Sequence, residues 1–263
     1  MKFLIFDILY ALFSFLTYFI SGSLTYLMGV SLWTENTYLN ISVLLLCIFC
    51  FLYIFVLVLG TLKNIFQPKL IIGDFPIGMN KDYIAWALNS IFCGIFQTAP
   101  FYSSSRLLFS LSWLFHRLMG MKLGFSSLVG LKTTIRQPEL IEVGSGSILG
   151  LGCILSCHFT ANGKIHTQLP IKIGNKSIIG GYSAIAPGTT VGNNSVVGAE
   201  TRVFPNCDIG NNVQIGALCH IDQGVKIPDN VKIKSYSRIR KTDEIKSGEI
   251  WQGNPAQKIG EIS

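Results

Sequence analysis

Residues 173–196 read as four consecutive blocks of six: IGNKSI, IGGYSA, IAPGTT and VGNNSV. Each block begins with an aliphatic residue, and steps of six continue this series without a miss. The full set is Ile173, Ile179, Ile185, Val191, Val197, Val203, Ile209, Ile215, Ile221, Ile227 and Ile233. The residue four places later is always small or β-branched, and glycine often follows the aliphatic residue. A period of six excludes both an amphipathic helix and a simple alternating strand.

A solenoid explains this period. Each hexad supplies one short strand and a turn, three hexads make one triangular coil, and stacked coils bury a continuous aliphatic column. The pattern recurs earlier at Val143, Leu149 and Leu155, and more weakly at Leu123 and Val129. The block at 141–143 is shifted by two residues, which predicts a small bulge between coils. We therefore predict a mostly β chain with a solenoid that begins near Leu123.

The N-terminal third is typical of a membrane protein. The chain is 49% hydrophobic and 13% charged, and its mean hydropathy is +0.47. Residues 3–30 carry one charge, Asp7, and residues 39–62 carry none. Since about 20 apolar residues span a bilayer, two transmembrane helices are expected. Lys2 precedes the first span, and Lys63, Lys69 and Lys81 follow the second, whereas the connection between the spans has no Lys or Arg. This distribution predicts a multi-pass inner-membrane protein with both termini in the cytoplasm.

Two further apolar segments follow the spans. Residues 83–101 are uncharged, and they could form a third span, a re-entrant element or a surface helix, of which we favour the last. Residues 106–122 mix apolar and basic side chains, which predicts an amphipathic helix against anionic lipid. The expected domains are two transmembrane helices at 1–65, interfacial helices at 66–122, the β-helix at 123–240 and a closing segment at 241–263.

The net charge indicates the kinds of binding partner, and the cysteine content indicates the cellular compartment. The net charge of +7 comes without a basic stripe or a nucleic-acid motif, so we expect an anionic membrane surface and a phosphorylated cofactor as partners, and no nucleic acid. The seven cysteines show neither a disulfide framework nor a metal-ligand spacing, which fits a reducing cytoplasm.

Three motifs accompany the repeat. They are SCHF at 156–159, PIKIGN at 170–175 and WQGNPA at 251–256. With the tandem hexads, the chain from Leu123 to its C-terminus resembles the hexapeptide-repeat acyltransferase superfamily, and more narrowly the exopolysaccharide O-acetyltransferases. The membrane spans add a similarity to the C-terminal region of membrane-bound nonribosomal peptide synthetases. The resemblance implies a left-handed parallel β-helix, a homotrimer, acetyl-CoA or another acyl-CoA as co-substrate, and no metal.

His158 is the candidate general base. Acyl transfer from a thioester needs a group that removes the proton of the attacking hydroxyl or amine, and an imidazole titrates near neutrality. His158 lies where the aliphatic register lapses at Ala161 and Thr167, which indicates a functional loop on a rigid scaffold. His166, further along this loop, is the alternative. Cys157 and His158 are poorly placed to form a Cys-His nucleophile–base pair, because adjacent residues on a strand point to opposite faces.

The resemblance also implies the remaining site residues. The backbone N–H of Gly181 corresponds to the oxyanion donor, and Gly198 and Ala199 correspond to the turn that contacts the pantetheine arm. Arg202 and Lys258 are candidates for binding phosphates, with solvated surface positions as the alternative.

The expected function is a membrane-bound acyltransferase, most readily an O-acetyltransferase. Its acceptor would be a hydroxyl or amine of a surface-polysaccharide, lipid-linked or peptide molecule, and an acyl-carrier protein as donor is also compatible with the sequence. One alternative is a noncatalytic trimeric scaffold. Another is a zinc hydrolase like the β-helical carbonic anhydrases, but these need three converging histidines. Beyond His116, the chain offers only His158, His166 and His220, without an i,i+5 pair.

Overall fold

The computed structural model describes residues 4–100 and 108–262. Lys2 and Arg106, which entered the predicted topology and amphipathic helix, lie outside these ranges. The chain forms two compact units. One is helical and contains the chain up to Lys69 together with Ile84–Met119. The other contains Leu70–Tyr83 and the chain from Gly120 onward.

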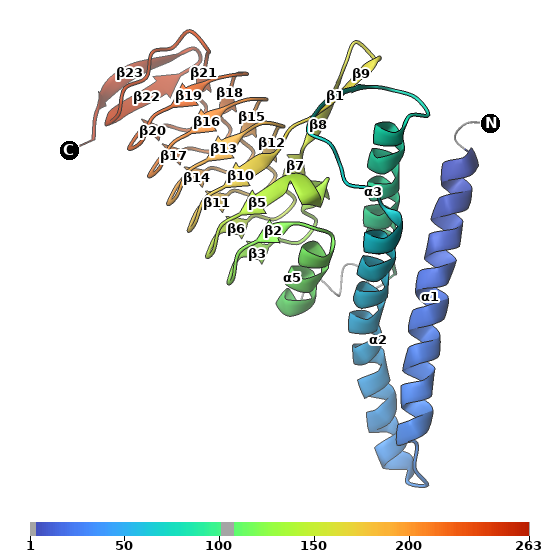
Figure 1. The fold of residues 1–263 in the computed structure, drawn as a ribbon. Coiled ribbons are helices and arrows are strands. Elements are labelled where there is room, and N and C mark those ends of the chain that lie inside the picture. The colour runs from blue at the N-terminus through green and yellow to red at the C-terminus, as the bar shows by residue number, and fades with distance from the viewer. Residues whose placement is uncertain (1–3, 101–107, 263) are drawn as a thin grey trace. The chain divides into compact units, whose positions relative to one another are not determined.

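The second unit is a solenoid of parallel strands, as predicted (Figure 1). Three sheets run along it, and six coils each contribute one strand to every sheet. Its hexapeptide repeats imply the left-handed form. Sheet I contains β2 (Lys122–Leu123), β5 (Ile141–Val143), β10 (Ile171–Ile173), β13 (Thr190–Val191), β16 (Asp208–Ile209) and β19 (Lys226–Ile227).

The other two sheets continue each coil. Sheet II contains β3 (Leu128–Val129), β6 (Ile148–Leu149), β11 (Ile178–Ile179), β14 (Val196–Val197), β17 (Gln214–Ile215), β20 (Lys232–Ile233), β22 (Glu249–Gly253) and the antiparallel β23 (Ala256–Glu261). Sheet III contains β4 (Thr134–Arg136), β7 (Ile154–Ser156), β12 (Ala184–Ile185), β15 (Arg202–Val203), β18 (His220–Ile221) and β21 (Arg238–Ile239). We name each corner of the coil by the two sheets it joins.

Two buried columns fill the solenoid. The aliphatic series is at most 5% exposed, from Val129 to Ile233. The small residues form the second column, in which each hydroxyl links neighbouring coils. Ser177 Oγ donates to the carbonyl of Gly192 at 2.6 Å and accepts from the N–H of Ser195 at 3.1 Å. A buried hydroxyl is tolerated there because both of its hydrogen-bonding roles are fulfilled.

The predicted bulge lies between the first two coils. Residues one coil apart are separated by 18 positions throughout most of the solenoid, as in Lys172 opposite Thr190. Lys122 pairs instead with Glu142, a separation of 20. The two additional residues are accommodated at corner III–I, in the 3₁₀ helix η1 (Pro138–Leu140).

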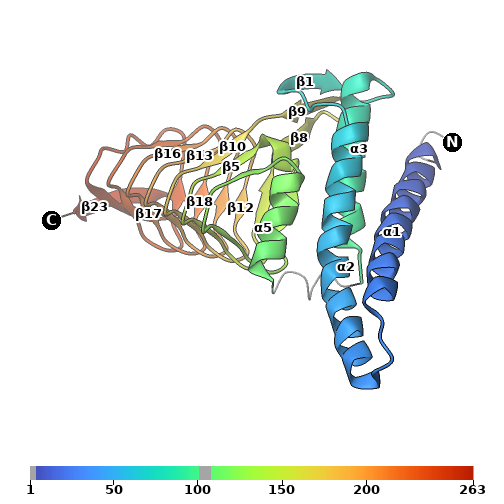
Figure 2. The ribbon, with the colours of Figure 1, turned by 60° about the horizontal axis from the view of Figure 1, so that its bottom comes forward.

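A larger insertion separates the second and third coils. Ile141 pairs with Ile171, 30 positions on, so this coil carries 30 − 18 = 12 additional residues. They form the hairpin β8 (His158–Ala161) and β9 (Ile165–Gln168), where the sequence predicted only a polar loop. β1 (Gly73–Pro76) pairs antiparallel with β9, and the three-stranded sheet projects from the coils (Figures 1 and 2). Residues 70–83, assigned from sequence to the interfacial segment 66–122, thus pack with the β-helix.

The helical unit contains four described helices: α1 (Leu4–Leu32), α2 (Thr37–Phe66), α3 (Lys81–Gln97) and α5 (Phe109–Leu118). Within the described ranges, α1 and α2 are the two helices long and apolar enough to cross a membrane. Only 17% and 11% of their most apolar windows are buried, which distinguishes them from core helices of a soluble protein.

The shorter helices share a core with the long ones. Phe92 of α3 and Phe115 of α5 belong to the same buried cluster as Phe13 and Phe55. His116, which the sequence placed at the lipid interface, is buried, and its Nδ1 lies 2.7 Å from the carbonyl oxygen of Ser112. The amphipathic helix thus turns this histidine toward protein, where its ring also packs edge-on against Phe115 with centroids 5.0 Å apart.

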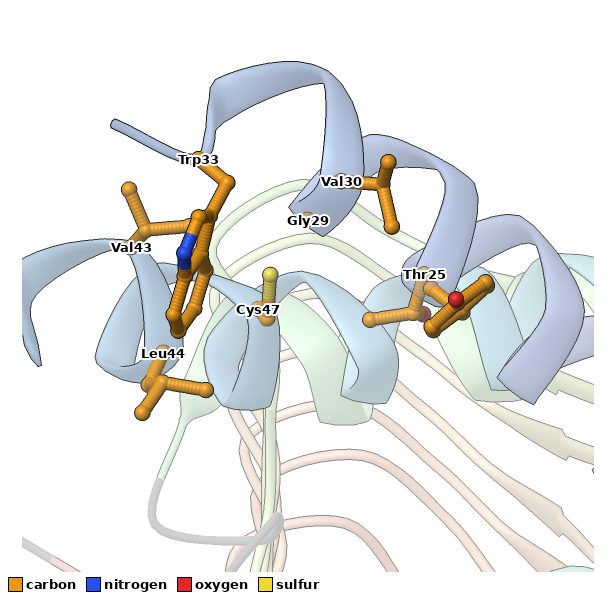
Figure 3. Close-up of a pocket in the computed structure, with 8 residues that line it drawn as sticks. Thr25, Gly29, Val30, Trp33, Val43, Leu44 and Cys47 are labelled. Carbon is orange, nitrogen blue, oxygen red and sulfur yellow. The ribbon is translucent and has the colours of Figure 1, made fainter. Parts of the chain in front are cut away.

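An apolar pocket of about 710 Å³ lies between α1 and α2 (Figure 3). Thr25, Gly29 and Val30 line it from α1, and Val43, Leu44 and Cys47 from α2, with Trp33 beside Val43 and Leu44. Its lining contains no histidine or carboxylate that could serve as a general base, so we place the candidate site elsewhere.

The buried column predicts the effect of a core charge. Ile215→Asp places a carboxylate at a position that is 2% exposed, and it should cost more than about 4 kcal/mol and abolish the cooperative melt of the β-helix. Circular dichroism of the full chain in detergent measures this, with Ile215→Val as the control. Cys207→Ser should be mild, since serine occupies this position in other coils. A cooperative melt in the aspartate variant would contradict the β-helix core.

Candidate active site

His158 lies at corner III–I, at the first residue of the inserted hairpin. Its Nδ1 is 2.7 Å from Oε1 of Gln137, which belongs to the two-residue insertion one coil earlier. Ser156 Oγ lies 3.4 Å from the same nitrogen and donates to the His158 carbonyl at 3.1 Å. With Nδ1 held by the protein, Nε2 is the nitrogen that can face a substrate.

His166 packs behind His158. The two rings are stacked, with centroids 4.8 Å apart and planes at 20°. The ring of Phe75 on β1 lies 4.9 Å from the His166 ring, centroid to centroid. His166 is only 2% exposed. Thr167 donates to a carboxylate oxygen of Asp74 at 2.6 Å, which ties β1 to the hairpin. The hairpin therefore holds His158 against a buried aromatic stack.

Burial dominates the electrostatics of this pair. It lowers the pKa of His158 to about 4, with smaller contributions from the His166 and Arg136 charges. Burial also lowers the pKa of His166. The sequence suggested titration near neutrality, whereas a pKa of about 4 keeps the imidazole neutral above that pH, because the buried site solvates an imidazolium poorly. His158 is thus in the proton-accepting form at physiological pH.

Cys157 is not activated as a nucleophile. Its side chain is buried, its Sγ donates to the carbonyl of Leu140 at 3.7 Å, and burial raises the thiol pKa to about 12. A thiol with such a pKa carries almost no thiolate at neutral pH.

The predicted oxyanion donor and the predicted pantetheine-binding turn lie at a different corner. Gly181 follows β11 and Ala199 follows β14, so both occupy corner II–III of successive coils. A Cβ on Gly150 would come within 2.6 Å of the Gly181 nitrogen, so glycine is needed where coils stack this closely. Within the described residues, neither the Gly181 nor the Ala199 N–H donates a hydrogen bond to another coil.

A contrast with corner I–II makes these two groups notable. There the corresponding N–H groups are capped by a ladder of side chains: Asn193 accepts from the Asn175 N–H at 2.7 Å, and Asn211 from the Asn193 N–H at 2.8 Å. The Gly181 and Ala199 N–H groups therefore remain available to a ligand. One coil further along the same corner, the Ala217 N–H donates instead to Ser235 Oγ at 3.1 Å.

Of the two predicted phosphate ligands, Arg202 borders a hollow. This hollow, of about 450 Å³, lies at the edge of sheet III and is lined by Tyr182, Glu200, Arg202, Leu218 and His220. Lys258 lies on β23, where it pairs with Glu249 at 3.0 Å and Glu261 at 2.7 Å. Its charge is therefore already matched by carboxylates.

The structure thus brings His158 and His166 together, and places Gly181, Gly198 and Ala199 along another corner. Among residues 4–100 and 108–262, no three His, Cys, Asp or Glu side chains gather as a metal site. Gln137 was missed from sequence. The two-residue shift near 141–143 marked its insertion, but no local pattern revealed that its side chain reaches the next coil.

Residues 170–205 and 206–241 match the bacterial transferase hexapeptide (six repeats) family. The matched residues form the coils from β10 to β21. The search of curated proteins gave no match.

Several solved structures are similar to part of this chain. An N-acyltransferase from Bacillus cereus, AntD, in complex with dTDP and 3-hydroxybutyryl-CoA, is 20% identical, with a TM-score of 0.47 over 56% of this chain and 86% of the other. A UDP-N-acetylglucosamine O-acyltransferase from Moraxella catarrhalis is 19% identical, with a TM-score of 0.36 over 53% and 65%. A maltose O-acetyltransferase from Clostridium difficile is 20% identical, with a TM-score of 0.35 over 61% and 83%. These similarities concern the fold alone.

Proposed function

We propose that this protein is a membrane-anchored acyltransferase that moves an acyl group from acyl-CoA to an acceptor hydroxyl or amine. The observation that carries the proposal is His158, neutral and fixed through Nδ1 by Gln137 at 2.7 Å, at the main insertion in a transferase-type β-helix. A neutral imidazole whose ring is oriented by a hydrogen bond at Nδ1 suits a general base that accepts a proton at Nε2.

The proposed reaction uses each group once. Nε2 of His158 takes the proton as the acceptor oxygen or nitrogen attacks the thioester carbonyl. The resulting oxyanion is held by a backbone N–H, for which Gly181 is the candidate. The intermediate collapses with cleavage of the carbon–sulfur bond, and the imidazolium returns its proton to the leaving thiolate. The lowered pKa of His158 favours this return, because burial destabilises the imidazolium.

The two halves of this site occupy different corners of one chain, which favours assembly between copies. Sheet II supports such contact, because Leu128, Ile148 and Ile178 lie in register on its outer face, 38–39% exposed. Exposed aliphatic side chains stacked in this way are suited to an interface. We propose a homotrimer in which His158 of one copy faces Gly181, Gly198 and Ala199 of the next, with Arg202 near the coenzyme phosphates.

The two long helices support a membrane location. We propose that α1 and α2 span the inner membrane with the β-helix in the cytoplasm, where acyl-CoA is available. The turn at 33–36 carries no Lys or Arg, whereas basic residues follow α2, and this difference favours the proposed orientation. A membrane-associated acceptor follows from the anchor, and an O-acetyl transfer to a polysaccharide or lipid-linked molecule is the variant we favour.

The first test removes the base. His158→Ala should lower kcat by about 10²- to 10⁴-fold while coenzyme A binds almost normally, because the coenzyme groove is backbone. His166→Phe should keep substantial activity, since the ring stack persists. The wild-type rate should fall only as pH approaches about 4, where His158 becomes protonated. Acyl transfer assays against pH measure this. A near wild-type rate in His158→Ala would overturn the assignment and favour His166.

The second test addresses the shared site. Ala199 is exposed, so Ala199→Trp should fill the groove without disturbing the core. Neither this variant nor His158→Ala should be active alone. Chains of the two variants, refolded or co-expressed together, should recover part of the wild-type rate by pairing intact halves. An active monomer in detergent, measured by light scattering, would refute the shared site.

A further inference from the structure

Gln137 has an unusual backbone for this solenoid. Its φ is +53°, in the left-handed region. Elsewhere in the coils, positive φ at non-glycine residues follows one rule, falling three places after the aliphatic residue, as at Tyr182 and Glu200. Gln137 comes two places after Ile135, and outside the hairpin it is the one described non-glycine residue that breaks this rule. A left-handed glutamine costs about 1 kcal/mol or more, so the surroundings must enforce it.

The insertion explains how the position is enforced. Pro138 occupies the place three after Ile135, and its ring fixes a negative φ. The left-handed residue therefore moves back by one, to Gln137, and η1 absorbs the two additional residues. The same step aims the glutamine side chain inward, where it is 1% exposed.

The side chain meets the imidazole from the neighbouring coil. Arg136 pairs with Ser156 in the register of β4 and β7, so Gln137 lies beside the start of the hairpin. Its Oε1 is 2.7 Å from Nδ1 of His158. That distance is typical of a strong hydrogen bond, and Ser156 at 3.4 Å is a weaker neighbour.

We infer that Gln137 is the positioning residue of the active site, whose amide oxygen accepts from Nδ1–H of His158 and thereby fixes the tautomer in which Nε2 carries no proton. This inference rests on the proposed role of His158. A neutral acceptor orients the ring without stabilising its charged form, whereas a carboxylate would do both.

The charged and titratable groups around the ring are consistent with this role. His166 stacks on one face, Arg136 lies on the strand that carries Gln137, and Cys157 is a buried neutral thiol. None of these supplies a carboxylate to the imidazole. Introducing one should therefore have a clear effect.

Two substitutions at Gln137 separate orientation from charge. Gln137→Leu keeps the size but removes the acceptor, and it should lower kcat on the order of 10- to 100-fold with KM for acyl-CoA unchanged. Gln137→Glu keeps the acceptor and adds a negative charge, which should raise the acid limb of the pH–rate profile by about 1 to 3 pH units. Gln257, exposed on β23, provides matched controls: Gln257→Leu and Gln257→Glu should change neither quantity.

The outcomes distinguish this inference from the proposed function. If His158→Ala is inactive but Gln137→Leu keeps the wild-type kcat and Gln137→Glu leaves the acid limb in place, Gln137 does not position the base. If His158→Ala itself is fully active, the proposed function fails instead.

A measurement on the wild-type chain covers the case in which Gln137 variants do not fold. In ¹⁵N-histidine spectra, the resonances lost in His158→Ala belong to His158. At neutral pH they should show a protonated Nδ1 and an unprotonated Nε2. The opposite tautomer would mean that Gln137 donates through its amide nitrogen, and it would overturn the inference.

Discussion

The stacking of one coil on the next is the constraint on which this structure depends. Strands of neighbouring coils pair in parallel with a fixed 18-residue offset, and an aliphatic residue from each hexad enters the interior. Buried serines such as Ser177 and Ser195 fulfil their hydrogen-bonding roles only at this spacing. Additional residues can therefore be inserted without disturbing the column only where the chain turns a corner.

Both insertions in the described solenoid occur at corner III–I, on successive coils. The first contributes two residues and sets Gln137, and the second contributes twelve and begins with His158. Their side chains meet at 2.7 Å. Gln137 and His158 are thus brought together at a corner, where the length of the coil can vary, while the stacked coils on either side fix the geometry of the pair. Burial against His166, which itself packs on Phe75, then lowers the pKa of His158 and keeps the base neutral.

The fold could be predicted because its signal is local and repeated: Ile173 to Ile233 display the period without any knowledge of contacts. His158 could be proposed from its motif and from the lapse after Leu155. The partners of His158 could not, because each depends on contacts between distant segments. Gln137 reaches the site through stacking of coils, and β1 is four residues, GDFP, without a strand pattern of its own. The depressed pKa of His158 likewise follows from burial, which the sequence does not display.

A structure of the trimer with coenzyme A bound would test the central claim most directly, namely that His158 acts on a thioester lying between two copies. We expect the coenzyme sulfur within about 3.5 Å of Nε2 of His158. We also expect the pantetheine arm along Gly198 and Ala199 of the neighbouring copy, with Gln137 still bound to Nδ1. A sulfur located at another corner, with His158 facing only protein, would contradict the claim.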